Sequence, residues 1–141
     1  MSTQEKYKLK GCLSISGDKS ISHRSVILGA MSVGQMEIHN LLESKDVMST
    51  INILRKLGVK IKKYNGVWIV NGVGTCGFKQ PNQKLDAGNS GTTSRLMFGA
   101  VATNPINTTF TGDKSLSSRP MSRVTNFLED IGVKINLTKN N

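Results

Sequence analysis

The sequence predicts an α/β fold built from two tandem βαβαββ units, of which the second is incomplete. Segments from the first half of the 141-residue chain recur in the second half with a period of about 72 residues. Extended, partly alternating stretches are interleaved with amphipathic helical ones, as in α/β proteins. Asn65-Gly66 lies between two strand-like runs, and this dipeptide is the strongest short signal for a β-hairpin.

The first unit is expected to run strand, loop, helix, strand, loop, helix, hairpin. Its strands are expected at residues 7–15, 35–41, 59–63 and 67–71. The first helix is expected to follow Arg24, at the end of a polar, glycine-led loop. The second helix has apolar residues at helical spacing after Ser44, which is its candidate N-cap.

The second unit repeats these elements. GDKSISHRSVILGAM aligns with GNSGTTSRLMFGAVA, and GVKIK aligns with GVKIN. A strand is expected at 106–111, and an apolar stripe predicts a helix ending near residue 131. Pro120 suits the first position of that helix, and Gly132 suits the position just after its end.

The octapeptide GDKSISHR, at residues 17–24, returns as GDKSLSSR at residues 112–119 with six of eight residues unchanged. These are not matching positions of the repeat, because the counterpart of 17–24 is the segment 88–95. The octapeptide instead serves the two different helix starts of a βαβαββ unit. Helix starts have free backbone N–H groups and the positive end of the helix dipole, so both positions suit an anion.

The period also predicts where the second unit stops. Asn65-Gly66 corresponds to Lys139-Asn140, so the returning hairpin strand is missing and we expect a truncated unit. The expected organisation is an N-terminal strand within residues 1–16, a first unit at 17–80 and an incomplete second unit at 81–141.

Composition narrows the class of partner. The formal net charge of +10 indicates an anionic partner, but aromatic residues are only 5% of the chain and are not interleaved with basic ones, which disfavours nucleic acid. Cys12 and Cys76 have no metal-ligand or redox spacing, so we expect free thiols and a cytoplasmic location. No apolar run is long enough for a transmembrane helix, and the first residues lack the apolar core of a signal peptide.

Hydroxyls, cations and glycine-exposed amides gather at three helix starts. The side chains are Lys19, Ser20 and Arg24; Asn89, Ser90, Thr92, Thr93 and Arg95; and Lys114, Ser115, Ser117 and Arg119. Arginine grips phosphate or carboxylate bidentately and lysine acts as a mobile point charge, so the set can bind more than one anionic group. The alternative is that the hydroxyls only cap helices and the arginines are solvated. For any single helix start this alternative is a better explanation than anion binding. For the set of three helix starts, anion binding is the better explanation.

Metal ions and organic cofactors are not expected. GVGTCG, at residues 72–77, fits a dinucleotide-binding pattern, but no helix opens after it and a linker is the better interpretation. His23 and His39 have no partner at ligand spacing, and His23 is expected at the surface of a helix start. Asp18 and Asp113 are expected to cap helices, so the chain offers no convincing acid–base pair.

Three linked motifs, GDKSISHR, LDAGNSGTTSRL and GDKSLSSRPM, resemble the amino-terminal part of the 5-enolpyruvylshikimate-3-phosphate synthase (EPSP synthase, or 3-phosphoshikimate 1-carboxyvinyltransferase) family. The resemblance covers nearly the whole chain, and Ser16 departs from it where the family usually has proline. It implies two domains, each of three βαβαββ units, in an inside-out α/β barrel. It also implies the shikimate-pathway reaction, in which the carboxyvinyl group of phosphoenolpyruvate passes to the 5-hydroxyl of shikimate 3-phosphate and phosphate is released, without a metal or cofactor.

The resemblance also implies roles for individual residues. The substrate-binding set that it implies is Lys19, Ser20, Arg24, Asn89, Gly91, Thr92 and Arg119. Within this set, the first loop binds shikimate 3-phosphate through its serine and arginine, and its lysine lies between both substrates. Gly91 lets phosphoenolpyruvate approach the backbone, Arg119 holds its anionic groups, and Asn89 supports that loop.

No catalytic residue is identified within this chain, because the resemblance places the general base in the carboxy-terminal part of the enzyme. It also assigns residues 1–16 to the second domain. The partners it implies are shikimate 3-phosphate, phosphoenolpyruvate and that carboxy-terminal part, and the isolated chain is expected to be inactive or nearly so. Two alternatives stay open: a non-catalytic module that binds phosphorylated metabolites, and a basic nucleic-acid-binding domain.

Overall fold

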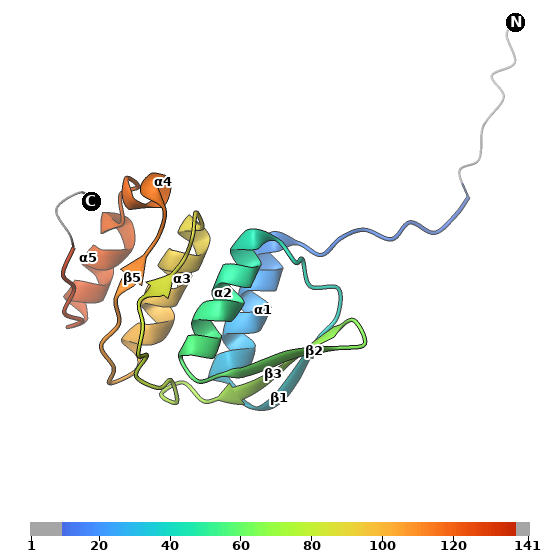
Figure 1. The fold of residues 1–141 in the computed structure, drawn as a ribbon, viewed down its shortest axis with the longest axis horizontal. Coiled ribbons are helices and arrows are strands. Elements are labelled where there is room, and N and C mark those ends of the chain that lie inside the picture. The colour runs from blue at the N-terminus through green and yellow to red at the C-terminus, as the bar shows by residue number, and fades with distance from the viewer. Residues whose placement is uncertain (1–9, 138–141) are drawn as a thin grey trace, which may run out of the picture.

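Helices and strands alternate along the chain in the computed structural model, which describes residues 10–137 (Figure 1). The first group of elements is α1 (Lys19–Met31), β1 (Val33–Ile38), α2 (Lys45–Lys56), β2 (Lys60–Tyr64) and β3 (Val67–Val73). The second group is β4 (Leu85–Asp86), α3 (Gly91–Ala102), β5 (Phe110–Thr111), α4 (Lys114–Ser117) and α5 (Ser122–Asp130). The mixed α/β class predicted from the sequence is confirmed.

The first group is a three-stranded antiparallel sheet with helices on one face. The strand order is β1-β3-β2, and α1 packs against β1 and β3. Trp68 and Val70 of β3 are buried, as is Ile61 of β2, which pairs with Val70. The residues between them along each strand are half-buried or exposed. This alternation is that of an antiparallel sheet with one covered face.

The hairpin between β2 and β3 is confirmed. Asn65 has φ 46° and Gly66 has φ 81°, and the flanking Tyr64 and Val67 pair directly. Two consecutive positive φ values are those of a type I′ turn, whose twist matches the twist of the strands that it joins.

The second group begins with a short parallel pair. Leu85 pairs with Phe110 and Asp86 with Thr111, so α3 is the crossover between β4 and β5. The chain then forms the single turn of α4 and the longer α5, and α3 packs against both α2 and α5.

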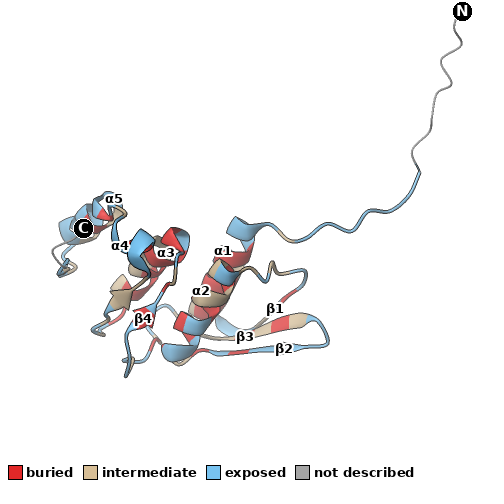
Figure 2. Cartoon of the chain, turned by 45° about the horizontal axis from the view of Figure 1, so that its top comes forward, coloured by how far each residue is buried: buried red, intermediate tan, exposed pale blue. Residues whose placement is uncertain are grey.

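One hydrophobic core runs through both groups. Figure 2 shows buried residues along α1, α2 and α3. Ile51, Ile53 and Leu54 of α2 are fully buried, and so are Leu85 of β4 and Met97 of α3. Because α2 packs against α1, α3 and β4, it is the central helix that ties the two groups together.

The expected starts of α1 and α3 are wrong by several residues, whereas α2 begins directly after the expected N-cap Ser44. The first helix begins at Lys19 and not after Arg24, because the Asp18 carboxylate caps it and accepts the Ile21 N–H at 2.7 Å. In the second unit, α3 already begins at Gly91, with Ser90 as its N-cap. Most of the side chains assigned to polar loops therefore lie in the first two turns of helices.

The strand predictions outside the hairpin are only partly correct. Residues 10–15 form no strand and are exposed, and residues 7–9 lie outside the described residues. The expected strand at 35–41 is β1, shifted to Val33–Ile38, because Asn40 turns the chain with φ 54°. The strand expected at 106–111 shrinks to the two residues of β5, because its partner β4 is equally short.

Pro120 is not the first residue of a helix. The chain first forms α4, capped by Asp113, and α5 starts only at Ser122 with Met121 at its N-cap. The predicted end of this helix is correct, since Gly132 has φ 93° directly after the C-cap residue.

Two glycines allow the packing to be tested. A Cβ on Gly72 of β3 would lie 2.2 Å from the Ser32 carbonyl oxygen and 2.6 Å from that of Gly29. We expect Gly72→Ala to lower the free energy of unfolding by about 1–3 kcal/mol in urea denaturation, because backbone atoms must move. Gly99→Ala on α3 is the matched control, since no neighbouring atom lies within 4 Å. It should raise the stability by roughly 1 kcal/mol, and equal effects at both positions would contradict this packing.

Candidate functional site

Three helices begin at the same edge of the molecule. In Figure 1, α1, α2 and α3 lie side by side and each starts at the upper end of the view. Their N-caps are Asp18, Ser44 and Ser90, and each side chain accepts a backbone N–H from the first turn of its helix. The positive ends of three helix dipoles therefore point to one region, which favours negative charge there.

Two polar side chains near the start of α1 are exposed and available to a ligand. Ser20 and Arg24 are four residues apart on the helix, so they lie on the same face, and both are exposed. Within residues 10–137, neither side chain forms a hydrogen bond or an ion pair. Lys19 behaves differently, because its ammonium group pairs with the Asp46 carboxylate in the first turn of α2. We call residues 19–24 the binding turn.

A second cluster joins α3 to the segment after β5. Asn89 Nδ2 donates to Asp113 Oδ2 at 2.7 Å, and Asn89 Oδ1 accepts from Arg119 Nη2 at 2.8 Å. Arg119 also donates to Ser115 Oγ at 3.2 Å. The hydrogen bond from Asn89, with a further one from the Leu116 backbone N–H, lowers the pKa of the Asp113 carboxyl. The Asp113 carboxylate thus holds the Asn89 side chain, and Asn89 in turn orients the Arg119 guanidinium.

Gly91 lies beneath two guanidinium groups at the start of α3. A Cβ at this position would be 2.7 Å from Arg95 Nη1 and 3.3 Å from Arg119 Nη1. Arg95 also donates to the Pro120 carbonyl oxygen at 3.2 Å. Thr92, the next residue of the helix, is exposed. The absence of a side chain at Gly91 therefore leaves room for both arginines beside the first turn of α3.

The structure brings most of the predicted site residues together. Lys19, Ser20 and Arg24 share the binding turn, and Asn89, Gly91, Thr92 and Arg119 surround the start of α3. The two clusters are connected through α2, because the Asp46 carbonyl oxygen accepts the Thr93 hydroxyl at 3.1 Å while the Asp46 carboxylate pairs with Lys19.

One prediction about the site was wrong, and one residue was left out of the set that the resemblance implies. Arg95 was named among the anion-binding side chains of the helix starts but not among the implied substrate-binding residues, and its guanidinium lies beside Gly91. His23 was expected at the surface, and this is wrong: it is fully buried, and its Nδ1 lies 2.8 Å from Thr50 Oγ1. Helical spacing to Val26 and Ile27 was the available signal, because residues three and four positions apart share a face of a helix and both of these apolar residues are buried.

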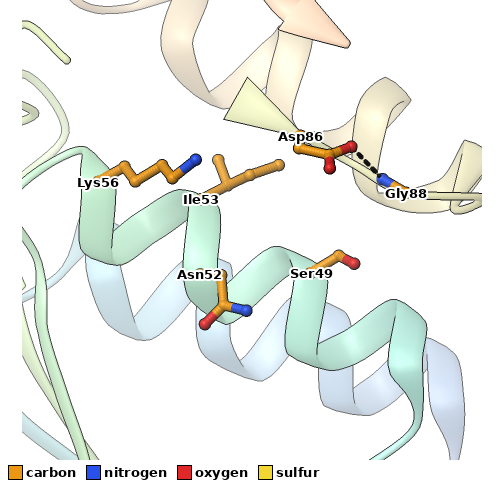
Figure 3. Close-up of a pocket in the computed structure, with 6 residues that line it drawn as sticks. All are labelled: Ser49, Asn52, Ile53, Lys56, Asp86 and Gly88. Carbon is orange, nitrogen blue, oxygen red and sulfur yellow. Dashed lines mark hydrogen bonds between the residues drawn. The ribbon is translucent and has the colours of Figure 1, made fainter. Parts of the chain in front are cut away.

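A cavity lies outside these two clusters. It has a volume of about 380 Å³ and lies between α2 and the segment that follows β4 (Figure 3). Its lining residues are Ser49, Asn52, Ile53, Lys56, Asp86 and Gly88. In Figure 3 the Asp86 carboxylate is already engaged by the Gly88 N–H, at 2.8 Å. No predicted site residue lines this cavity, so it is separate from the candidate site.

The described residues also limit the chemistry of the site. Between residues 10 and 137, no three His, Cys, Asp or Glu side chains gather where they could hold a metal ion. In the same range, no helix has the length and apolar character needed to cross a membrane. The arrangement is therefore one of cations, hydroxyls and helix N-termini, which can bind and orient anionic groups.

Known proteins match this chain over most of its length. The family model for EPSP synthase (3-phosphoshikimate 1-carboxyvinyltransferase) matches residues 3–141. The 3-phosphoshikimate 1-carboxyvinyltransferase of Novosphingobium aromaticivorans is 52% identical over 127 residues, which are 89% of this chain and 29% of that protein. The protein of the same name from Paracoccus denitrificans is 50% identical over 136 residues, which are 96% of this chain and 31% of the relative.

A solved structure agrees with these relatives. EPSP synthase from Acinetobacter baumannii superimposes with a TM-score of 0.86 at 40% identity, over 91% of this chain and 29% of that one. The chain therefore spans less than a third of the length of these relatives.

The Asn89 cluster gives a first test of the site. We expect Asn89→Ala to raise the Asp113 pKa toward its ordinary value, because the carboxylate loses its strongest hydrogen-bond donor. A carboxyl titration followed by NMR measures this shift. Asn126→Ala, at an exposed position of α5, is the control and should leave Asp113 unchanged. An identical Asp113 titration in wild type and Asn89→Ala would show that this hydrogen bond does not form in solution.

Proposed function

The chain belongs to the EPSP synthase family, and from this premise we propose that it forms the shikimate 3-phosphate side, and part of the phosphoenolpyruvate side, of an enolpyruvyl transferase. The proposed reaction moves the carboxyvinyl group of phosphoenolpyruvate to the 5-hydroxyl of shikimate 3-phosphate. A new C–O bond forms at that hydroxyl, its proton leaves, and the C–O bond to phosphate breaks. Both substrates and the released phosphate are anions, which explains the formal net charge of +10.

One observation carries the proposal: the starts of α1 and α3 lie at the same edge of the molecule, and each carries a cluster of cations. In the binding turn, Arg24 and Ser20 are exposed and have no partner among residues 10–137. A phosphate at this helix start would take a bidentate contact from the guanidinium and a hydrogen bond from the hydroxyl. Each charged hydrogen bond contributes about 1.5–3 kcal/mol, so a few suffice to hold a dianion.

We assign phosphoenolpyruvate to the start of α3. Gly91 is buried, and its missing side chain lets the guanidinium groups of Arg119 and Arg95 approach the first turn of α3, where Thr92 adds an exposed hydroxyl. Asn89 supports this position by orienting Arg119. Lys19 would lie between the two substrates, because its partner Asp46 is also in contact with α3 through Thr93.

Turnover would require more than this chain. Its carboxylates near the site are committed, Asp46 to Lys19 and Asp113 to Asn89. We propose that the general base and further cations for phosphoenolpyruvate come from the part of the enzyme that this chain does not span. The isolated chain would then bind substrate but show little or no activity.

A recurring close approach of backbones favours the tandem-unit interpretation of the fold. A Cβ on Gly17 would lie 2.0 Å from the Asn40 carbonyl oxygen, and a Cβ on Gly112 would lie 2.7 Å from the Gly88 carbonyl oxygen. In each proposed unit, the segment before the first helix therefore lies against the segment before the second helix. We propose units at 17–80 and 81–141, with 1–16 belonging to a second domain, within an inside-out α/β barrel of the whole enzyme.

The alternatives are less well supported. A module that only binds phosphorylated metabolites would use the same binding turn, and it differs in gaining no activity from the rest of the enzyme. A nucleic-acid-binding domain would use the exposed lysines of β2, which lie away from the helix starts (Figure 1). A cytoplasmic location is part of the proposal, and the free, exposed Cys12 and Cys76 are consistent with a reducing compartment.

Substrate binding tests the proposal directly. We expect saturable amide shifts in the binding turn when the chain is titrated with shikimate 3-phosphate in an NMR experiment, and weaker shifts with inorganic phosphate. Arg24→Ala should raise the Kd about 10- to 100-fold, because a charged bidentate contact is lost. Lys62→Ala, an exposed cation on β2, is the charge-matched control and should bind like wild type. Equal losses in both variants, with a steep salt dependence, would favour nonspecific polyanion binding instead.

Complementation tests the enzymatic part of the proposal. Mixing the chain with a polypeptide that covers the remaining length of a relative should restore phosphate release from phosphoenolpyruvate and shikimate 3-phosphate. The Arg24→Ala chain should restore much less under the same conditions. Tight substrate binding without any restored activity would instead favour the non-catalytic module.

A further inference from the structure

A continuous chain of hydrogen bonds runs through the interior between α1, α2 and α3. His23 Nδ1 lies 2.8 Å from Thr50 Oγ1, and Thr50 Oγ1 lies 2.9 Å from Thr93 Oγ1. All three residues are fully buried. Thr93 Oγ1 also lies 2.8 Å from Ser90 Oγ and 3.1 Å from the Asp46 carbonyl oxygen. We call His23, Thr50 and Thr93 the relay.

The direction of proton donation follows from the other side of the imidazole ring. His23 Nε2 is buried, and no group among residues 10–137 forms a hydrogen bond with it. A neutral imidazole carries one N–H. A buried N–H without an acceptor costs more free energy than a buried bare ring nitrogen without a donor. The proton therefore belongs on Nδ1. His23 then donates to Thr50, Thr50 donates to Thr93, and Thr93 donates to the Asp46 carbonyl or to Ser90.

The relay returns to the binding turn by a second route. Asp46, whose carbonyl oxygen accepts from Thr93, pairs with Lys19 through its carboxylate. Lys19 lies four residues before His23 on α1, which is about one helical turn. The first turns of α1 and α3 are thus joined twice through α2, once by the relay and once by the ion pair.

We infer that His23 is a positioning residue, held as the neutral Nδ1–H tautomer, and that the relay it starts fixes the binding turn of α1 against the start of α3. The effect on ligand affinity rests on the function proposed above, whereas the tautomer and the coupling between helices do not. His23 does not touch the ligand in this account. It acts through Thr50 and Thr93 on the geometry of Ser20, Arg24 and the α3 start.

Burial favours the neutral form of His23, and the two charged groups near it act in opposite directions. Burial is the largest influence and lowers the pKa of His23 below its ordinary value. Among the described residues, the charged groups that act on it are Asp46 from α2, which raises the pKa, and Lys19 from α1, which lowers it. The link from His23 to α3 runs through the neutral hydroxyls of Thr50 and Thr93. Because the unfolded chain binds the proton more readily, stability falls as the pH drops below the ordinary histidine pKa of about 6.5.

The first measurement reads the tautomer and needs no ligand. Imidazole ¹⁵N spectra of the full chain should show a protonated Nδ1 and a bare Nε2 for His23 at neutral pH, and His39→Asn identifies which signals belong to the exposed second histidine. As the pH falls through the His23 titration, the amides of Ser90 and Thr93 should shift with the same midpoint. An Nε2–H tautomer, or α3 amides that do not follow the histidine, would overturn the inference.

Paired variants test the relay against a purely structural role. Thr50→Val removes the hydroxyl at nearly constant shape, and Thr50→Ser keeps it. We expect Thr50→Val to raise the Kd for shikimate 3-phosphate about fivefold, the value of one hydrogen bond, and Thr50→Ser to restore it. His23→Asn, which retains an N–H near the Nδ1 position, should likewise bind better than His23→Leu. Equal affinities for folded Thr50→Val and Thr50→Ser would overturn the inference.

The two readouts separate this inference from the proposed function. If wild type fails to bind shikimate 3-phosphate but shows the Nδ1–H tautomer and the coupled α3 amides, the proposed function fails and the relay stands. If wild type binds and the Thr50 pair does not differ, the proposed function stands and the relay fails. Should His23→Leu not fold, the Thr50 pair and the tautomer still decide the outcome.

Discussion

The geometry of the candidate site depends on the buried hydrogen bonds that hold three helix starts at one edge. Hydrophobic contacts fix the distances between helices but leave sliding along their axes less constrained, whereas hydrogen bonds between buried polar groups are directional and costly to break. His23, Thr50 and Thr93 make such contacts across α1, α2 and α3. These hydrogen bonds therefore fix the position of each helix along its axis relative to the other two. The side chains near the three helix starts are fixed relative to one another in the same way.

The alignment of the three helix starts concentrates positive charge at one edge of the molecule. Three parallel dipoles and several cations at one edge repel one another, and the chain offsets this with few carboxylates. Asp46 pairs with Lys19, while Asp113 is engaged by Asn89 and lies near Arg119. Asp46 holds Lys19 in place and Asp113 holds Asn89, whereas Arg24 stays exposed. The proposed anionic ligand would complete the charge balance, so the proposed reaction is consistent with the excess of positive charge.

The sequence could predict what local chemistry decides. The caps at Asp18, Ser44 and Asp113 and the Asn65-Gly66 turn are correct, because they depend on neighbours a few residues away. The repeat and three motifs likewise led to the family and to the residues grouped at the helix starts. What depended on tertiary partners was missed. The helices α1 and α3 start earlier than expected, the strand at 10–15 did not form, β5 was cut short by β4, and His23 turned inward toward Thr50.

A crystal structure of this chain with shikimate 3-phosphate would test the central claim most directly. The account predicts the phosphate group at the start of α1, with its oxygens about 2.7–3.2 Å from the Ser20 hydroxyl and the Arg24 guanidinium, and with the helix starts unmoved. A ligand bound instead against the lysines of β2, or at the cavity between α2 and β4, would contradict it.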